Sequence, residues 1–202
     1  MILSLYRLAT EFGAPLITMY LKRRLKRGKE DAPRFNERLG KAGRPRPEGH
    51  LIWMHGASVG ESLSMLPVIK EIVARANAPT VLVTTGTVTS AQLMAERLPE
   101  GAIHQYVPVD RLPYVTKFLD HWRPDVAFWW ESELWPNLIT ETHHREIPML
   151  LVNARMSPPS FKRWTRWISL ARSLLRKFDV VLAQTEPDAD RFRALGAKTV
   201  ER

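Results

Sequence analysis

The chain has 202 residues, of which 45% are hydrophobic and none is cysteine. A chain of this size and composition can bury a core, so a disordered protein, a disulfide scaffold and a thiolate metal site are excluded. Residues 1–47 hold 12 Lys and Arg against 4 Asp and Glu, whereas the remaining residues hold 18 against 17. Because the body is nearly neutral, the net charge of +9 does not predict a nucleic-acid partner.

Residues 1–28 predict a membrane-associated helix that lies on a membrane rather than across it. The longest uncharged stretch is residues 12–21, whereas a spanning helix needs about 20 residues. Pro15 would kink a helix or mark a restart. A polar stripe recurs at helical spacing on an otherwise apolar helix: Ser4, Arg7, Glu11, Thr18 and Lys22. The alternative is a helix that docks on the body of the protein or on a partner.

A basic run closes this segment, and its side chains are expected to contact anionic headgroups: Lys22, Arg23, Arg24, Lys26 and Arg27. The positive-inside rule places this run on the cytoplasmic side of a membrane. Residues 29–49 are polar and contain several Pro and Gly, so they predict a basic linker. One short helical turn is expected within it, around residues 35–39.

From residue 50 to residue 202, strand and helix patterns alternate. The predicted strands are short apolar runs at residues 51–55, 80–85, 104–109, 125–130, 148–153 and 179–184. The predicted helices between and after them are residues 61–76, 88–98, 112–122, 133–145, 160–178 and 188–195. Apolar strands that alternate with helices indicate an α/β, Rossmann-like parallel sheet with helices on both faces.

Ligands bind beyond the carboxyl ends of the strands in such a sheet, so the residues after each strand are the informative ones. The first of these segments reads HGASVGE at residues 55–61. Ser58 and Glu61 match a capping box, in which Glu61 has a purely structural role. The alternative is that Glu61, held ionised at a helix N-terminus, acts as a general base.

The segment WWESELWPN follows a second strand and places Glu131 at the strand end itself. Glu133 is explained by charge compensation in a first helical turn, with Ser132 as a cap. The tryptophans of this segment are assigned to the core rather than to a sugar platform: Trp129, Trp130 and Trp135. His143 and His144 fall on different helix faces, and no metal site is expected.

Two further groups allow two readings each. A run of threonines would either bind a phosphate or sugar, or form strand residues and a helix cap: Thr84, Thr85, Thr87 and Thr89. Residues 157–178 contain six basic residues and no acidic one. They predict either a solvated amphipathic helix on the sheet or a second contact with an anionic surface.

Four motifs together resemble the 3-deoxy-D-manno-octulosonic acid (Kdo) transferases of Gram-negative lipopolysaccharide assembly. They are SVGE at 58–61, ESELWPN at 131–137, NARMS at 153–157 and AQTEPDADRFRALGAK at 183–198. The resemblance implies the GT-B architecture, with two Rossmann-like domains across a cleft. The N-terminal domain would bind the acceptor, a lipid A precursor, and a C-terminal domain beyond Arg202 would bind the donor, CMP-Kdo.

The resemblance also implies roles for particular residues. Glu61 corresponds to the general base of an inverting transfer, and Glu131 to a glutamate that supports the transition state. Ser132 stands where the family usually has Thr, and Met156 where it usually has Leu. The acceptor is expected to contact Ser58, Gly60 and Arg155. No cofactor is implied, and the expected location is the cytoplasmic face of the bacterial inner membrane.

Two other functions stay open at the level of sequence. One is another GT-B transferase that acts on a lipid-linked acceptor, and the other is a non-catalytic, membrane-docking Rossmann-like module. If the Kdo transferase reading holds, the isolated chain should fold but not transfer sugar, because it lacks the donor domain.

Overall fold

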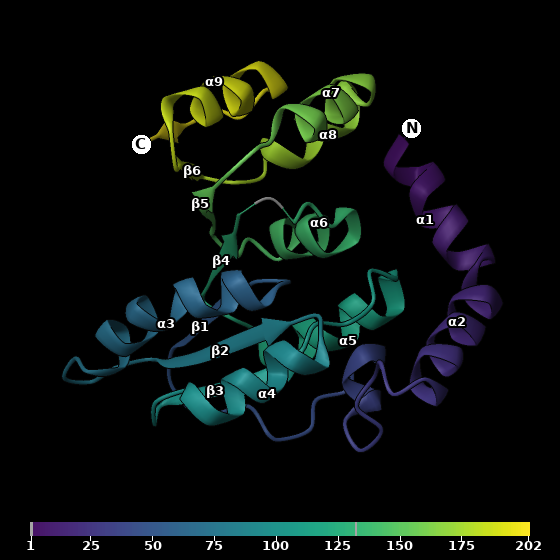
Figure 1. The fold of residues 1–202 in the computed structure, drawn as a ribbon, viewed down its shortest axis with the longest axis vertical. Coiled ribbons are helices and arrows are strands. Elements are labelled where there is room, and N and C mark those ends of the chain that lie inside the picture. The colour runs from purple at the N-terminus through teal and green to yellow at the C-terminus, as the bar shows by residue number, and fades with distance from the viewer. Residues whose placement is uncertain (1, 132) are drawn as a thin grey trace.

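The computed structural model describes residues 2–131 and 133–202, and within these ranges seven parallel strands form one sheet (Figure 1). The strand order is β3-β2-β1-β4-β5-β6-β7. The strands are β1 (Leu51–His55), β2 (Thr80–Thr85), β3 (Ala102–Tyr106), β4 (Val126–Trp130), β5 (Met149–Ala154), β6 (Val180–Ala183) and β7 (Val200–Glu201). The predicted Rossmann-like fold is therefore confirmed.

Helices cover both faces of the sheet, which explains why the strands are apolar runs without alternation. On one face, α3 (Val59–Val73) and α4 (Val88–Arg97) pack over a cluster that includes Met54 and Val83. On the other face lie α5 (Leu112–Trp122), α6 (Pro136–His144), α8 (Ile168–Leu175) and α9 (Glu186–Leu195). Trp53 and Trp129 lie at the centre of that second core, with ring centroids 4.7 Å apart.

Several predicted boundaries differ from the structure. Strand β3 spans Ala102–Tyr106 rather than residues 104–109, because its partner β2 ends at Thr85 and the Val107 N–H makes the last bond to it. Helix α6 begins at Pro136 rather than at residue 133, because the residue before a proline is disfavoured in a helix. The helix predicted at residues 160–178 is two helices, α7 (Pro158–Arg166) and α8, which are separated at Trp167.

The N-terminal segment forms α1 (Ile2–Phe12) and α2 (Ala14–Lys26), so the predicted restart near Pro15 is confirmed. Of the predicted polar stripe, Arg7 and Glu11 pair with the body, whereas Ser4, Thr18 and Lys22 are exposed. The Tyr6 hydroxyl donates to Asp110 at 2.8 Å, Arg7 pairs with Glu141 at 2.6 Å, and Arg111 pairs with Glu11 at 2.7 Å.

Six large side chains of α1 and α2 are more than half exposed, up to 83% for Phe12: Leu5, Leu8, Phe12, Leu16, Met19 and Tyr20. Helix α1 thus contacts the body through polar pairs while it leaves large apolar side chains exposed. Helix α2 instead buries Leu21 and exposes Lys22, Arg23 and Lys26 together with its apolar side chains.

Residues 29–49, predicted as a linker, pack as an ordered cover on the free edge of β3. The expected helical turn is the 3-10 helix η1 (Phe35–Leu39). Arg34 donates to the His104 carbonyl at 3.0 Å, and the Tyr106 N–H donates to the Glu37 carboxylate at 2.8 Å. Side chains therefore satisfy the backbone groups that an edge strand leaves open.

Asp110 links the N-terminal helix to the body at the start of α6. Its two carboxylate oxygens accept from the N–H groups of Asn137 and Leu138 at 3.0 and 2.8 Å, and Tyr6 donates to it as well. The N-cap residue of α6, Trp135, makes no side-chain cap. A residue distant in sequence therefore caps this helix.

We expect Asp110→Asn to lower the free energy of unfolding by about 1–3 kcal/mol, because an amide oxygen cannot replace both acceptors of a buried cap. Chemical denaturation of the full-length protein measures this change. Tyr6→Phe is the matched control, since it removes one donor to the same carboxylate and should cost about 1 kcal/mol. A loss for Asp110→Asn no larger than that for Tyr6→Phe would contradict the capping role.

Candidate active site

The candidate site lies where the sheet changes direction. The chain runs from β1 outward through β2 to β3, then returns to place β4 on the other side of β1. The crevice between the carboxyl ends of β1 and β4 is thus the topological switch point, where ligands bind in open α/β sheets. Glu61 follows β1 and Glu131 follows β4, so the fold brings together the two glutamates that sequence motifs singled out.

Glu61 takes part in the predicted helix cap and also faces the site. The Glu61 N–H donates to the Ser58 hydroxyl at 3.2 Å. The Glu61 Oε2 atom accepts from the Ala57 N–H at 2.8 Å, one residue earlier than in a standard capping box. The other carboxylate oxygen makes no hydrogen bond with the described residues. The capping role and the general-base role predicted for Glu61 are therefore compatible with the same side-chain position.

Gly56 permits this geometry, although sequence reasoning did not select it. A Cβ atom on Gly56 would lie 2.8 Å from Met65 Cε and 3.1 Å from the Glu61 Cβ. Gly60 has more room, since a Cβ atom there would lie 3.9 Å from the Ser58 hydroxyl. Ser58 and Gly60 are exposed at the N-terminus of α3, where a ligand could reach them.

The backbone is strained at Glu131 and Asn153, which lie near the ends of the neighbouring strands β4 and β5. Glu131 has φ +60° and Asn153 has φ +54°, values in the left-handed region that few non-glycine residues adopt. The Glu131 N–H still donates to the Val152 carbonyl at 3.0 Å, so the left-handed backbone there begins where β4 stops, whereas Asn153 lies within β5 at a register shift. Strain of this kind persists where surrounding structure enforces it, and it clusters at functional sites.

Three carboxylates interact in the crevice. Burial raises the pKa of Glu131, as does the nearby negative charge of Glu61, while Arg155 opposes the shift. Burial also raises the pKa of Glu133, against a 2.7 Å hydrogen bond donated by the Trp135 indole. Arg155 is exposed at the end of β5 and close enough to Glu131 to act on it. Ser132, expected as a cap, lies outside the described residues.

His55 lies in the HGASVGE segment, but no role was predicted for it from the sequence. It is fully buried, its Nδ1 lies 3.0 Å from the Thr84 hydroxyl, and burial lowers its pKa to about 4. Thr84 also accepts from the Trp53 indole at 2.8 Å. A buried, neutral imidazole therefore begins the HGASVGE segment, and its place at a strand end was the only signal in the sequence.

The threonine run has structural roles at three of its four positions. Thr84 and Thr85 are buried and pair with His55 and His104, and Thr87 caps α4. The structural reading is therefore confirmed for these three. Trp129 and Trp130 are buried in the core as predicted, whereas Trp135 is half-buried beside Glu133.

The basic residues in the last turns of α2 and directly after it have two different roles. Lys22, Arg23, Lys26 and Arg27 are exposed. Arg24 instead donates to buried Glu30 at 2.6 Å, so it fixes the chain after α2. Within residues 2–131 and 133–202, no helix has the length and apolar character needed to cross a bilayer, and no three side chains group as a metal site.

Comparison with known proteins identifies relatives along nearly the whole chain. The model of a family described as 3-deoxy-D-manno-octulosonic-acid transferase (kdotransferase) matches residues 33–201. A probable mitochondrial 3-deoxy-D-manno-octulosonic acid transferase of Arabidopsis thaliana is 39% identical over 96% of this chain and 44% of its own length. The 3-deoxy-D-manno-octulosonic acid transferase of Rickettsia bellii is 36% identical over 96% of this chain and 46% of its own length. The 3-deoxy-D-manno-octulosonic acid transferase of Bordetella pertussis is 32% identical over 96% of this chain and 47% of its own length.

A Rossmann-like domain with carboxylates at its switch point is matched over residues 33–201 by a family of transferases. The chain belongs to this family, the 3-deoxy-D-manno-octulosonic acid (Kdo) transferases. It spans less than half the length of the relatives named above.

We expect Glu131→Gln to stabilise the protein at neutral pH. The native pKa of Glu131 lies above its unfolded value, so ionisation costs the native state stability as pH rises through that range. The gain should be at most about 1 kcal/mol, because water screens this partly exposed cluster. It should vanish near about pH 3, where unperturbed carboxylates are protonated.

Thermal unfolding over a pH series measures this effect in the full-length protein. Glu96→Gln is the control, an exposed glutamate on α4. Equal pH profiles for Glu131→Gln and the wild type would contradict the proposed repulsion within the cluster.

Proposed function

We propose that this chain is the acceptor-binding part of an enzyme that transfers Kdo from CMP-Kdo to a lipid A precursor, with inversion. The observation on which the proposal rests is the placement of Glu61. Its carboxylate lies at the β1–β4 switch point, held by the Ala57 N–H through one oxygen, with Glu131 close by. Membership of the Kdo transferase family supports the sugar and the reaction type.

In the proposed reaction, Glu61 accepts the proton of a glucosamine hydroxyl as its oxygen attacks the anomeric carbon of Kdo. The bond from that carbon to the phosphate of CMP breaks, and CMP leaves with the electron pair. The Ala57 N–H fixes the carboxylate, so little reorganisation is needed when the proton moves. Glu131 would support the positive charge that develops on the sugar.

Acceptor binding is assigned to groups that surround these glutamates. Ser58 and Gly60 lie at the N-terminus of α3, where free backbone N–H groups favour electronegative atoms. Arg155 is exposed at the neighbouring strand end and would hold a phosphate of the lipid. The donor, CMP-Kdo, is assigned to a domain outside this chain. The relatives, each about twice as long as this chain, support that assignment.

The same proposal places the enzyme on an anionic membrane surface, at the cytoplasmic face of the bacterial inner membrane. The exposed apolar side chains of α1 and α2 support it, together with exposed Lys22, Arg23, Lys26 and Arg27. Helix α7 would add a second contact, since Lys162, Arg163 and Arg166 are exposed and none of its residues is buried. Arg24 is left out of the membrane contact because Glu30 holds it.

Glu61→Gln should lower kcat by on the order of 10²–10⁴, because glutamine keeps the cap but cannot accept the proton. The assay uses the full-length protein with CMP-Kdo and saturating lipid A precursor, so that kcat is measured rather than binding. Glu71→Gln on the exposed side of the same helix is the control. Melting temperatures are compared in parallel. A kcat within a few-fold of wild type would return Glu61 to a capping role alone.

Phe12→Ser combined with Leu16→Ser should weaken binding to anionic vesicles without altering the fold, since both side chains are 66% exposed or more. Vesicle co-sedimentation measures binding, and circular dichroism reports the fold. Leu63→Ser, at 42% exposure on α3, is the control. Point variants are preferable to a deletion, which would also remove Tyr6 from Asp110. Unchanged vesicle binding would mean that these two side chains do not meet the membrane.

A further inference from the structure

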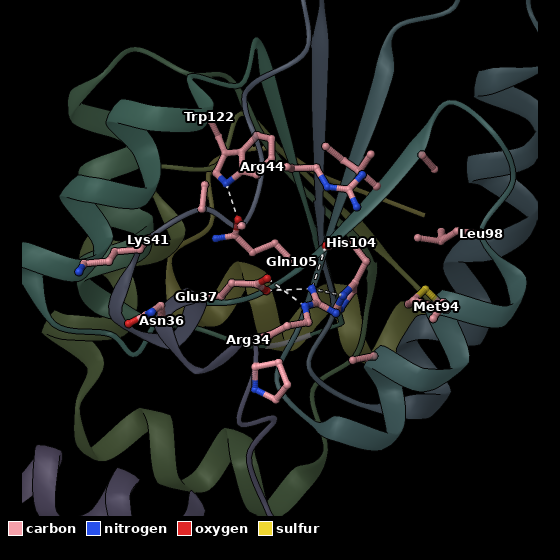
Figure 2. Close-up of a pocket in the computed structure, with 17 residues that line it drawn as sticks. Arg34, Asn36, Glu37, Lys41, Arg44, Met94, Leu98, His104, Gln105 and Trp122 are labelled. Carbon is pink, nitrogen blue, oxygen red and sulfur yellow. Dashed lines mark hydrogen bonds and ion pairs between the residues drawn. The ribbon is translucent and has the colours of Figure 1, made fainter.

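A second cavity lies at the edge of the sheet, away from the carboxylates of the candidate active site (Figure 2). It has a volume of about 700 Å³ and is enclosed by residues 33–44, by α4, by β3 and by Trp122 at the end of α5. Strand β3 is separated from β1 by β2, so this cavity and the β1–β4 crevice occupy different parts of the molecule.

The buried polar side of the cavity presents a hydrogen-bond donor without an acceptor. Gln105 is 2% exposed, and its Oε1 atom accepts from the Trp122 indole at 2.9 Å. An indole N–H can only donate, so this contact fixes the orientation of the amide. The Gln105 Nε2 atom is therefore the free end, and among the described residues it has no hydrogen-bond partner. A buried donor of this kind favours a ligand that brings an acceptor oxygen.

Two arginines add positive charge to the same cavity. Arg34 is fixed by Glu37 at 2.9 and 2.8 Å and by the backbone and ring of His104 at 3.0 Å (Figure 2). Arg44 makes no ion pair with any carboxylate in the described ranges, and its side chain lies on the side of the cavity where Leu98 is found (Figure 2).

The acidic and titratable groups of the cavity are already engaged. Both oxygens of Glu37 accept, from Arg34 and from the Tyr106 N–H. Burial, and then the charges of Arg34 and Arg44, lower the pKa of His104 to about 3, so its ring is neutral. The cavity therefore has donors and positive charge but no free negative group among the residues that line it.

The remaining wall is apolar. It consists of Ala95 on α4, Leu98 directly after α4 and Ile103 on β3, all at least partly exposed. Purely polar anions gain nothing from such a wall, whereas a hydrocarbon body would be removed from water on it.

We propose that this edge cavity binds a small anionic amphiphile, with a carboxylate or phosphate head at Arg44, the Gln105 amide as a further donor on the lining, and an apolar body against α4. A bound ligand would connect residues 33–44 to α4 and so strengthen the cover over the edge of β3. The head-group chemistry is common to fatty acids, to lipid phosphates and to free phosphate, and the test separates these sources.

Isothermal titration of the full-length protein tests the proposal with three probes: octanoate, octyl phosphate and inorganic phosphate. We expect saturable binding of one equivalent of octanoate or octyl phosphate, and much weaker binding of inorganic phosphate. Arg44→Gln should weaken binding by about 10–100-fold, which corresponds to the loss of one charge-assisted hydrogen bond. Gln105→Glu keeps the acceptor for Trp122 but replaces the free donor by a negative oxygen, so it should abolish binding.

The matched control is Arg75→Gln, an exposed arginine after α3, which should bind as wild type. Loss of binding in Phe12→Ser instead would assign the amphiphile to the exposed apolar side chains of α1 and α2 and overturn the proposal. Equal affinity for inorganic phosphate, unchanged affinity in Arg44→Gln, or no binding of any probe would overturn it as well. If Gln105→Glu does not fold, Arg44→Gln decides the outcome.

Discussion

The buried carboxylate of Asp110 is the contact on which the arrangement of the other parts depends. It accepts from Tyr6 of α1 and from two backbone N–H groups at the start of α6. Helix α6 directly follows the segment with Glu133 and Trp135, so its N-terminus fixes one wall of the crevice. Since Asp110 is also bonded to α1, the outer helices and the crevice share one buried anchor. A displacement of α1 would remove the Tyr6 hydroxyl from Asp110 at the N-terminus of α6. An unpaired buried polar group lowers the free energy of unfolding.

The parallel sheet explains why the candidate site is at one edge only. All strand pairs are parallel, so every strand delivers its following residues to the same rim. The switch between β1 and β4 then decides which of these residues meet. Glu61, Glu131 and Glu133 meet there despite mutual repulsion, with Arg155 as the positive neighbour. Gly56 and the strained backbone at Glu131 allow these close approaches. Carboxylate repulsion and backbone strain therefore lower the local stability at the place where a ligand would bind.

Much of this fold could be predicted from the sequence, because buried parallel strands are continuous apolar runs and helices between them are periodic. The motif glutamates could be placed at strand ends for the same reason. Contacts between distant segments could not be predicted. Asp110 has no signal as a helix cap, since Asn137 lies 27 residues away and Tyr6 lies 104 away. The break at Trp167 contains neither Gly nor Pro, and it arises because α8 turns into the core while α7 buries no residue. Arg24 resembles its basic neighbours in sequence, but Glu30 captures it.

The polar contacts of α1 with the body have a consequence for how this helix can vary among relatives. The inward positions form specific pairs, Tyr6 with Asp110, Arg7 with Glu141 and Glu11 with Arg111. Each pair constrains two positions that are distant in the sequence. A substitution at one position should therefore be accompanied by a compensating substitution at the other. The exposed apolar side chains of α1, Leu5, Leu8 and Phe12, make no such pairs with the described residues, so other apolar side chains could replace them. Among relatives, the paired positions of this helix should therefore vary together with their partners, whereas its exposed apolar positions should vary independently.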